Sequence, residues 1–259
     1  MAQKYSLTLD GLETITSFGV YLAEGSLAGL LNLPPVEEDD LFNDWHERNG
    51  VEVHTHTPAL VRDTFGLNFI VPKNRVQEFT GFLKSKPVHT LAVPELSAGD
   101  GWEVIVRHRE KNVEDMGDGL RLLALDFCRY RDPAEPETET ADGTEFFTKL
   151  HGLGFKELRG TRAEMEKGSE VKDHLPGQTK ALTFEPYDIT LPIFYNGTGV
   201  MGARKRLLAF LVQKGERVLN YDGRTIKAVY KSNHSETLLP YENGAVWWEF
   251  DLTMMATSF

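Results

Sequence analysis

Two histidines, His54 and His56, have the spacing in this sequence that most suggests chemistry. On a strand, alternate residues share one face, so both imidazoles would point toward the same metal ion. No third or fourth ligand follows at a recognisable spacing, and the alternative is a solvated strand or loop face. With Asp63 the two histidines would suit a small hydrolase with a dispersed site. Because no nucleophile or metal set converges, we expect a protein that is not an enzyme and that holds no metal and no cofactor.

A run of four acidic residues is the second candidate, and it consists of Glu37, Glu38, Asp39 and Asp40. Neighbouring carboxylates can perform acid–base catalysis or bind calcium. However, the internal glycine and terminal glutamate of a calcium-binding loop are absent. The run therefore favours a solvated loop or the first turn of a helix, where negative charge is stabilising.

The remaining motifs offer no catalytic reading. Asp10-Gly11, Asp118-Gly119 and Gly197-Thr198-Gly199 lack the spacing of a phosphate-binding loop, and we expect hairpin turns there. The single cysteine, Cys128, follows an alternating strand without a nucleophile motif, which predicts a buried structural thiol. One cysteine excludes an intrachain disulfide and suits a reducing cytoplasm.

Length and composition favour two globular domains. The chain has 259 residues, of which 41% are hydrophobic and 26% are charged, whereas one domain usually has about 100–150 residues. The formal net charge of −11 argues against a nucleic-acid-binding protein, which needs clustered Lys and Arg. No stretch approaches the roughly 20 apolar residues of a membrane span, so we expect no membrane insertion.

A linker divides the chain near its midpoint. Asp132 to Gly143 reads DPAEPETETADG, which is rich in Pro and Glu and contains no large apolar residue. We therefore expect a first domain over residues 1–131, an acidic linker over 132–144 and a second domain over 145–259.

The two halves resemble each other. RDTFGLNFIV (Arg62 to Val71) and YDITLPIFY (Tyr187 to Tyr195) both alternate like strands, and Phe69 and Phe194 lie 194 − 69 = 125 positions apart. The same spacing relates Leu125 to Phe250, which suggests an internal duplication. The alternative is two unrelated β-rich domains that share common alternation.

Each half is expected to contain one helix among strands. Apolar residues at helical spacing predict helices over 76–83 and 203–211. Alternation predicts strands over 102–110, 120–127, 225–233 and 245–252. The fold class is therefore mainly β, with some α. We expect two tandem antiparallel β-sandwich or barrel domains, each with one packed α-helix, whose open strand edges invite pairing with a neighbour.

Two segments carry a resemblance to a known family. YSLTLDGLETITSFGVYLAEGS and NGVEVHTHTPALVRDTFGLNFIV resemble the tail-tube and distal-tail-protein family of long-tailed bacteriophages. In that family, strands of adjacent subunits join into a ring around a central channel. The chain departs from the usual distal tail protein because its second half looks like a copy of the first, rather than a different peripheral domain.

The resemblance implies a structural protein of the virion tail, assembled in the bacterial cytoplasm. Six chains, or three chains with pseudo-sixfold symmetry, would form a homo-oligomeric ring that contacts the tail-tube protein and the tail hub or tip protein. DNA would pass through the channel without being specifically bound, and the acidic run from Glu37 to Asp40 would face the channel and repel phosphates.

Several residues are candidates for subunit contacts. Trp247 and Trp248 are adjacent, so on a strand one enters the core and the other is free for an interface. The compact basic cluster would pair with an acidic surface of a neighbour or form a solvated helix face, and it comprises Arg204, Lys205 and Arg206. Trp45 and Trp102 are expected in the core. An alternative function is a carbohydrate-binding β-sandwich adhesion module, in which exposed aromatic residues such as Trp102 and Tyr230 would stack on sugars.

Overall fold

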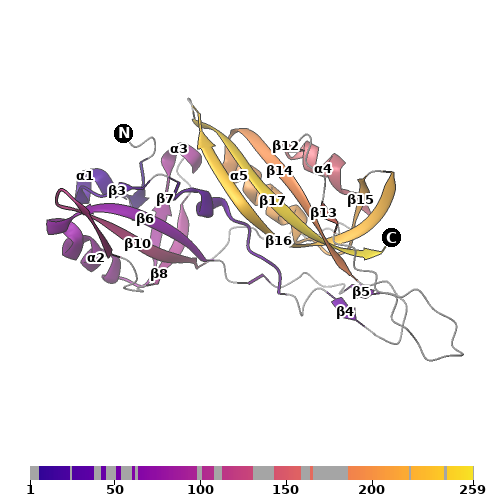
Figure 1. Cartoon of the computed structure of the whole chain (residues 1–259), viewed down its shortest axis with the longest axis horizontal. Coiled ribbons are helices and arrows are strands. Elements are labelled where there is room, and N and C mark those ends of the chain that lie inside the picture. Colours follow the sequence, from indigo (N-terminus) through magenta and orange to yellow (C-terminus); the bar gives the residue numbers. More distant parts are fainter. Residues whose placement is uncertain are drawn as a thin grey trace, which may run out of the picture.

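The computed structural model is mostly β, with two large sheets and few helices. It describes residues 6–23, 25–37, 42–44, 51–53, 60–61, 64–97, 101–107, 113–130, 143–158, 164–165, 186–221, 223–241 and 244–258. Figure 1 shows the two sheets side by side along the long axis of the molecule, one from each half of the chain.

The first sheet has the strand order β2-β1-β7-β8-β10-β6-β3, with β9 also paired to β10. Its strands are β1 (Thr8–Leu9), β2 (Leu12–Glu13), β3 (Tyr21–Leu22), β6 (Thr64–Pro72), β7 (His89–Ala92), β8 (Trp102–Arg107), β9 (Val113–Gly117) and β10 (Leu120–Arg129). The helices in the described part of this half are α1 (Thr14–Phe18), η1 (Ala28–Leu31), η3 (Lys73–Arg75), α2 (Val76–Lys84) and α3 (Pro94–Ser97). A separate small pair consists of β4 (Phe42–Asp44) and β5 (Val51–Val53).

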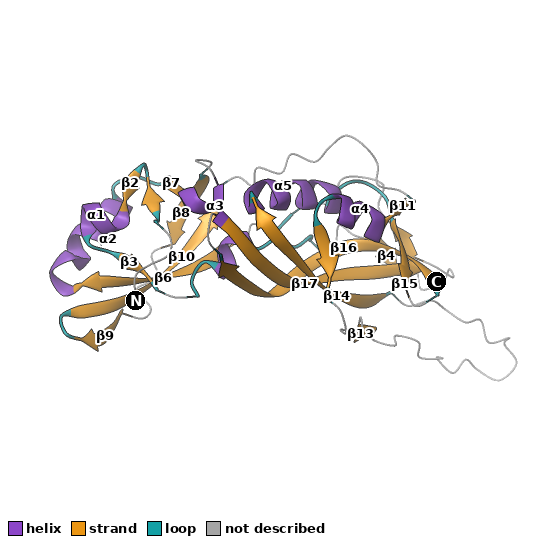
Figure 2. Ribbon diagram, turned by 90° about the horizontal axis from the view of Figure 1, so that it is seen from above, coloured by secondary structure: helices purple, strands orange, loops and turns teal. Residues whose placement is uncertain are grey.

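The second sheet has the order β11-β15-β16-β17-β14-β12, with β13 also paired to β14. Its strands are β11 (Thr144–Glu145), β12 (Phe155–Glu157), β13 (Glu164–Met165), β14 (Tyr187–Thr198), β15 (Arg217–Tyr221), β16 (Arg224–Pro240) and β17 (Ala245–Ser258). The helices are α4 (Phe146–Gly152) and α5 (Val200–Leu211). Figure 2 shows α5 and α4 lying on one side of this sheet.

The two sheets repeat one topology. In chain order, β3, β6, α2, β7, β8 and β10 have the counterparts β12, β14, α5, β15, β16 and β17. The central strand order β7-β8-β10-β6-β3 then matches β15-β16-β17-β14-β12 position by position. A short strand followed directly by a short helix, β2 with α1 and β11 with α4, also precedes each set. The halves thus share order in the chain as well as order in the sheet.

The expected constant spacing of 125 residues is wrong. Phe69 is fully buried in β6, whereas Phe194 lies on the outer face of the counterpart strand β14. The two side chains therefore lie on different faces of their sheets, one inner and one outer. Phe69 corresponds to Ile193, at 193 − 69 = 124. Across the sheet, Leu123 faces Phe69 and Phe250 faces Ile193, which gives 250 − 123 = 127 for β10 and β17. A one-residue slip along a strand reverses every side chain, so sequence matching alone could not fix the register.

The two predicted main helices are confirmed, and α5 begins three residues earlier than expected. The expectation of one helix in each half is wrong, because α1, α3 and α4 are present as well. These helices have seven residues or fewer, which is too short for helical periodicity to stand out in the sequence. Gly19 at φ 65° and Gly154 at φ 93° follow α1 and α4, and their left-handed backbone turns the chain into the next strand.

The predicted turns have mixed outcomes. Asp10-Gly11 joins β1 to β2 and Asp118-Gly119 joins β9 to β10, and all four residues have positive φ, as expected for hairpins. Gly197-Thr198-Gly199 is not a hairpin turn, because it forms the end of β14 and the N-cap of α5. The strand β11 begins at Thr144, within the expected linker, and residues 132–142 of that linker lie outside the described part of the chain.

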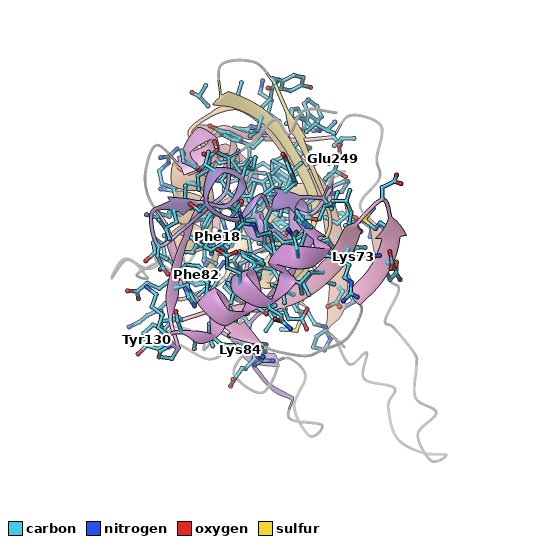
Figure 3. All side chains as sticks on the ribbon, turned by 90° about the vertical axis from the view of Figure 1, so that its left-hand side faces the viewer. Phe18, Lys73, Phe82, Lys84, Tyr130 and Glu249 are labelled. Carbon is cyan, nitrogen blue, oxygen red and sulfur yellow. The ribbon has the colours of Figure 1, made fainter. Side chains whose placement is uncertain are left out.

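Aromatic side chains attach the helices of the first half to its sheet. Phe18 of α1 lies against two residues of α2, with ring centroids 5.0 Å from Phe82 and 5.5 Å from Phe79. Phe79 in turn contacts Phe69 of β6 at 5.4 Å. Figure 3 shows Phe18 and Phe82 together at this end of the molecule. Burying rings of this size supplies much of the packing energy of a small core.

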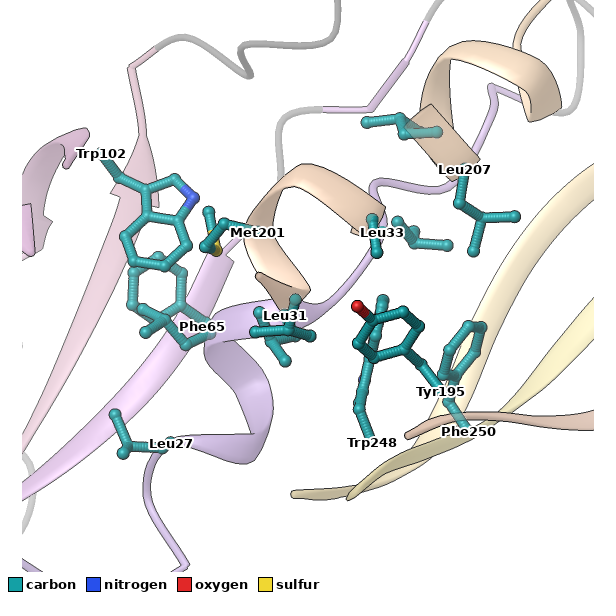
Figure 4. Close-up of a cluster of buried hydrophobic side chains, with 14 of the residues drawn as sticks. Leu27, Leu31, Leu33, Phe65, Trp102, Tyr195, Met201, Leu207, Trp248 and Phe250 are labelled. Carbon is teal, nitrogen blue, oxygen red and sulfur yellow. The ribbon is translucent and has the colours of Figure 1, made fainter. Parts of the chain in front are cut away.

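The hydrophobic core is continuous between the two halves. Figure 4 shows Met201 of α5 close to Trp102 of β8, with Leu31 beside it and Trp248 farther into the second half. All four side chains are buried. The two sheets therefore belong to one packed body in which the N-terminal turns of α5 fill the space between them.

Candidate functional site

The junction between the halves is built around residues 27–36, here called the crossing segment. This segment leaves the first sheet after β3 and runs along β16 of the second sheet. The Val36 N–H donates to the Lys231 carbonyl at 2.9 Å, and the Leu33 N–H donates to the Asn233 side chain at 3.0 Å. The Tyr230 hydroxyl donates to the Pro34 carbonyl at 3.1 Å. The crossing segment is thus held at three successive points.

Two buried arginines, one from each half, hold the same carbonyl of the crossing segment. Arg204 of α5 donates from Nε to the Leu31 carbonyl at 3.0 Å and to the Asn32 carbonyl at 3.2 Å. Arg129, the last residue of β10, donates to the Asn32 carbonyl at 3.2 Å and also to the Leu30 carbonyl. Both guanidinium groups are buried, so their hydrogen bonds to the backbone are charge-assisted and shielded from water.

One carboxylate lies among these groups. Glu236 of β16 accepts a hydrogen bond from the Asn233 amide. The Asn32 side-chain amide faces the same carboxylate, and it donates to Glu236 in the amide orientation that places its nitrogen there. Burial raises the pKa of Glu236 to about 7, although the Asn233 hydrogen bond and the charges of Arg129 and Arg204 act in the opposite direction. The junction cluster, defined as Asn32, Arg129, Arg204, Asn233 and Glu236, therefore combines two cations with one easily protonated acid.

An irregularity in β16 positions this carboxylate. The pairing of β16 with β17 shifts register between His234 and Thr237, and Ser235 has φ 57°. A left-handed conformation is unfavourable for a residue with a Cβ atom and marks a site that the surroundings hold in place. Because a bulge re-aims the side chains beside it, Glu236 can enter the junction while His234 is on the exposed face near Asp251.

The opposite face of the second sheet carries an apolar group, the outer patch, defined as Phe194, Leu239 and Trp247. The Phe194 and Trp247 rings stack with centroids 4.4 Å apart. Leu239 lies directly across the strand pair from Trp247 and is 50% exposed. The Trp247 Nε1–H donates to Glu249 at 3.0 Å, so the polar edge of the indole already has a partner. A stacked aromatic pair next to an exposed leucine is typical of a protein contact surface.

The residues predicted for subunit contacts separate into different environments. Trp248 and Arg204 are fully buried within one chain, so their assignment to a subunit interface is corrected. Strand alternation explains the first, because Trp247 and Trp248 point to opposite faces. Arg204 is turned into the junction by its place on α5. Lys205 is partly buried and Arg206 is exposed, on the helix side of the sheet and away from Trp247.

The acidic run is described only at its first residue, Glu37, which is exposed at the end of the crossing segment. Glu38, Asp39 and Asp40 lie outside the described residues, and so do Trp45, His54, His56 and Asp63. The prediction of a buried Cys128 is confirmed, as is the burial of Trp102. The assignment of Trp102 and Tyr230 as exposed sugar-stacking residues is wrong, because both side chains are buried at the junction.

Sequence reasoning missed two buried basic residues whose side chains contact backbone carbonyls at the C-terminal ends of the main helices. His89 is the first residue of β7, and its ring nitrogens lie 3.0 Å from the Leu83 carbonyl of α2 and 2.7 Å from Asp10. Arg217 is the first residue of β15, and it donates to the carbonyls of Phe210, Leu211 and Gln213. A basic residue at the first strand position after each helix is the sequence signal that could have revealed this repeated feature.

Replacing Asp10 with asparagine is expected to lower the unfolding free energy by about 1–3 kcal/mol at pH 7. Burial alone would raise the pKa of Asp10, but hydrogen bonds from Lys86, the Thr90 N–H and His89 lower it below 3.8. Ionised Asp10 therefore stabilises the folded state above pH 3.8, the pKa of an unperturbed aspartate. This stabilisation is lost as the pH falls through the lowered pKa of the folded state. The unfolding free energy, measured with urea between pH 7 and pH 2, should fall less steeply toward acid pH for the variant than for the wild type. Asp126→Asn, at an exposed site, is the control, and an equally steep fall in Asp10→Asn would contradict this account.

The described residues contain no group of three or more His, Cys, Asp or Glu side chains placed to hold a metal ion. Within the same part of the chain, no helix has the length and apolar character needed to cross a membrane. Comparison with protein-family models and with curated protein sequences gives no match.

Proposed function

We propose that this protein is a structural, non-enzymatic component of a phage tail or phage-like tail. It forms a ring around the central channel at the junction between tail tube and baseplate. The observation that carries this proposal is the topology repeated in the two halves, with corresponding strands and an equivalent main helix. Each half is then one tail-tube-type β-sandwich or barrel module, and one chain supplies two adjacent modules of the ring.

The contact between the halves supports a head-to-tail arrangement. The second half contributes α5 to the junction, whereas its counterpart α2 presents the exposed residues Gln77, Glu78 and Lys84 on its outer side. The junction therefore joins unlike surfaces of like modules. Contacts of this heterologous kind generate closed rings when their rotation closes. Three chains with pseudo-sixfold symmetry, or six chains with one half of each at the channel, would complete the ring.

The outer patch is the proposed contact with a neighbouring chain. Trp247 and Phe194 offer a flat stacked surface, and Leu239 adds an exposed aliphatic side chain beside it. Tail-tube protein and tail hub or tip protein are the proposed axial partners. Glu37 and the acidic residues after it would give the channel wall a negative charge, which lets DNA pass without binding. In this proposal the ring belongs to the virion tail and is assembled in the cytoplasm of the host.

The oligomeric mass tests the proposed function. Light scattering coupled to size exclusion should give a mass of three or six chains, and negative-stain images should show rings with sixfold or pseudo-sixfold symmetry. Three chains would mean that both halves line the channel, and six would mean that one does. A protein that stays monomeric at concentrations of several milligrams per millilitre would refute the ring.

Replacing Trp247 with alanine is expected to weaken ring assembly by about tenfold to a hundredfold, since a central aromatic contact contributes about 2 kcal/mol or more. The unfolding free energy of the single chain should change much less, because the side chain lies on the outer face of the sheet. Sedimentation velocity across a dilution series measures the assembly constant. Tyr21→Ala, at an exposed aromatic residue on the first sheet, is the matched control. Equal effects of the two variants would remove Trp247 from the interface.

A further inference from the structure

The junction cluster is the only place in the described part of the chain where a carboxylate lies among buried charges of both halves. Arg129 comes from β10 of the first half and Arg204 from α5 of the second half, and both are almost completely buried. Glu236 stands on a bulge whose Ser235 has a strained backbone. Local strain of this kind persists where surrounding contacts hold it, and it is frequent in segments that change conformation.

We propose that the junction cluster is a pH-sensitive lock between the two halves, in which gain of a proton by Glu236 tightens their packing and loss of it loosens them. This proposal concerns the chain itself and stands whether or not the protein forms a ring. The geometry behind it is one partly buried carboxylate that lies among side chains of the crossing segment, β10, α5 and β16.

The groups around Glu236 define what its charge acts on. Among the residues that the structure describes, Arg129 and Arg204 are the charged groups that face it, while Asn32 and Asn233 are neutral amides. The two basic residues of β16 that precede Glu236 most closely in the chain have partners elsewhere. Lys231 lies 2.9 Å from Asp188 of β14, and His234 lies on the exposed side, 3.9 Å from Asp251.

The direction of the pH effect follows from solvation. Both arginines are already hydrogen-bonded to the carbonyls of Leu30, Leu31 and Asn32. Their attraction to the ionised carboxylate therefore offsets only part of the solvation free energy that Glu236 loses on burial. Burial consequently raises the pKa of Glu236 from 4.5 to about 7. Glu236 then binds its proton more tightly in the folded protein, with the junction closed, than in the unfolded chain. The stabilisation is complete below pH 4.5 and is lost as the pH rises through 7.

Glu236→Gln tests the lock, because glutamine keeps the size of the side chain and cannot ionise. The unfolding equilibrium constant is measured with urea at pH 5 and at pH 8. Between these two values it should increase on the order of a hundredfold more in the wild type than in Glu236→Gln. Glu114→Gln, at an exposed site on β9, should retain the wild-type pH dependence.

Hydrogen exchange by mass spectrometry locates the effect in the wild-type protein and does not require that the variant folds. After correction for intrinsic exchange rates, peptides covering residues 27–36 and 200–211 should lose protection between pH 6 and pH 8, while those covering β6 and β10 should not. Protection at the junction that rises with pH, or a pH dependence shared equally by wild type and Glu236→Gln, would overturn the proposal.

Discussion

Replacing Arg217 with methionine is expected to lower the unfolding free energy by about 3–5 kcal/mol, the largest effect predicted for a single polar residue of this protein. The guanidinium donates to the carbonyls of Phe210, Leu211 and Gln213 at 2.6 to 2.8 Å. The first two belong to the last turn of α5, and Gln213 lies just beyond the end of the helix. Burial lowers the pKa of Arg217 to about 10, so the group remains charged at neutral pH and favours the negative end of the helix dipole. Methionine fills the space but leaves three buried acceptors without their donor.

Urea unfolding at pH 7 measures this loss, and Arg224→Met is the matched control. Arg224 is exposed at the start of the next strand, β16, and should tolerate the same change with less than about 0.5 kcal/mol. A loss for Arg217→Met no larger than for the control would mean that water replaces the guanidinium at the end of α5. Because total stability is typically about 5–15 kcal/mol, the expected loss should also be visible as a lower yield of folded protein.

The main elements of the fold were predictable from local pattern. Alternating runs predicted β6, β8, β10, β14, β16 and β17, and helical spacing predicted α2 and α5, because these elements bury one regular face. The register was not predictable. Phe69 matches Phe194 because the two residues are identical in type. In the fold, however, the equivalent of a buried residue is the one that is buried on the counterpart strand, and that residue is Ile193.

The junction could not be predicted from the sequence, because its contacts link residues about 100 to 200 positions apart. Arg204, Lys205 and Arg206 look like one basic cluster in the sequence. On α5 they point in different directions, and the first enters the core while the third remains exposed. The bulge at Ser235 also has no glycine at the residue of positive φ, so the sequence gives no local sign of it. The inward turn of Glu236 is thus a consequence of tertiary packing rather than of local backbone preference.

Replacing Arg204 with methionine is expected to lower the unfolding free energy by about 3 kcal/mol and to free the crossing segment. The side chain donates to the carbonyls of Leu31 and Asn32, which lie at the centre of that segment. Removing it leaves Arg129 as the one remaining charge-assisted donor to the Asn32 carbonyl among those described here. It also takes away one of the two cations that face Glu236 in the described part of the chain. Protonation of this acid should then become more favourable, and the pH dependence of stability should steepen.

Arg206→Met, two positions along the same helix but exposed, is the control and should be nearly neutral. Hydrogen exchange separates a loosened junction from a general loss of stability. In Arg204→Met, peptides over residues 27–36 should exchange faster under conditions where β14 and β17 keep their protection. If protection falls equally throughout the second sheet, Arg204 stabilises α5 on its own sheet rather than the contact between the halves. If neither variant changes exchange, the hydrophobic core that joins Met201, Trp102 and Leu31 suffices to hold the two sheets together.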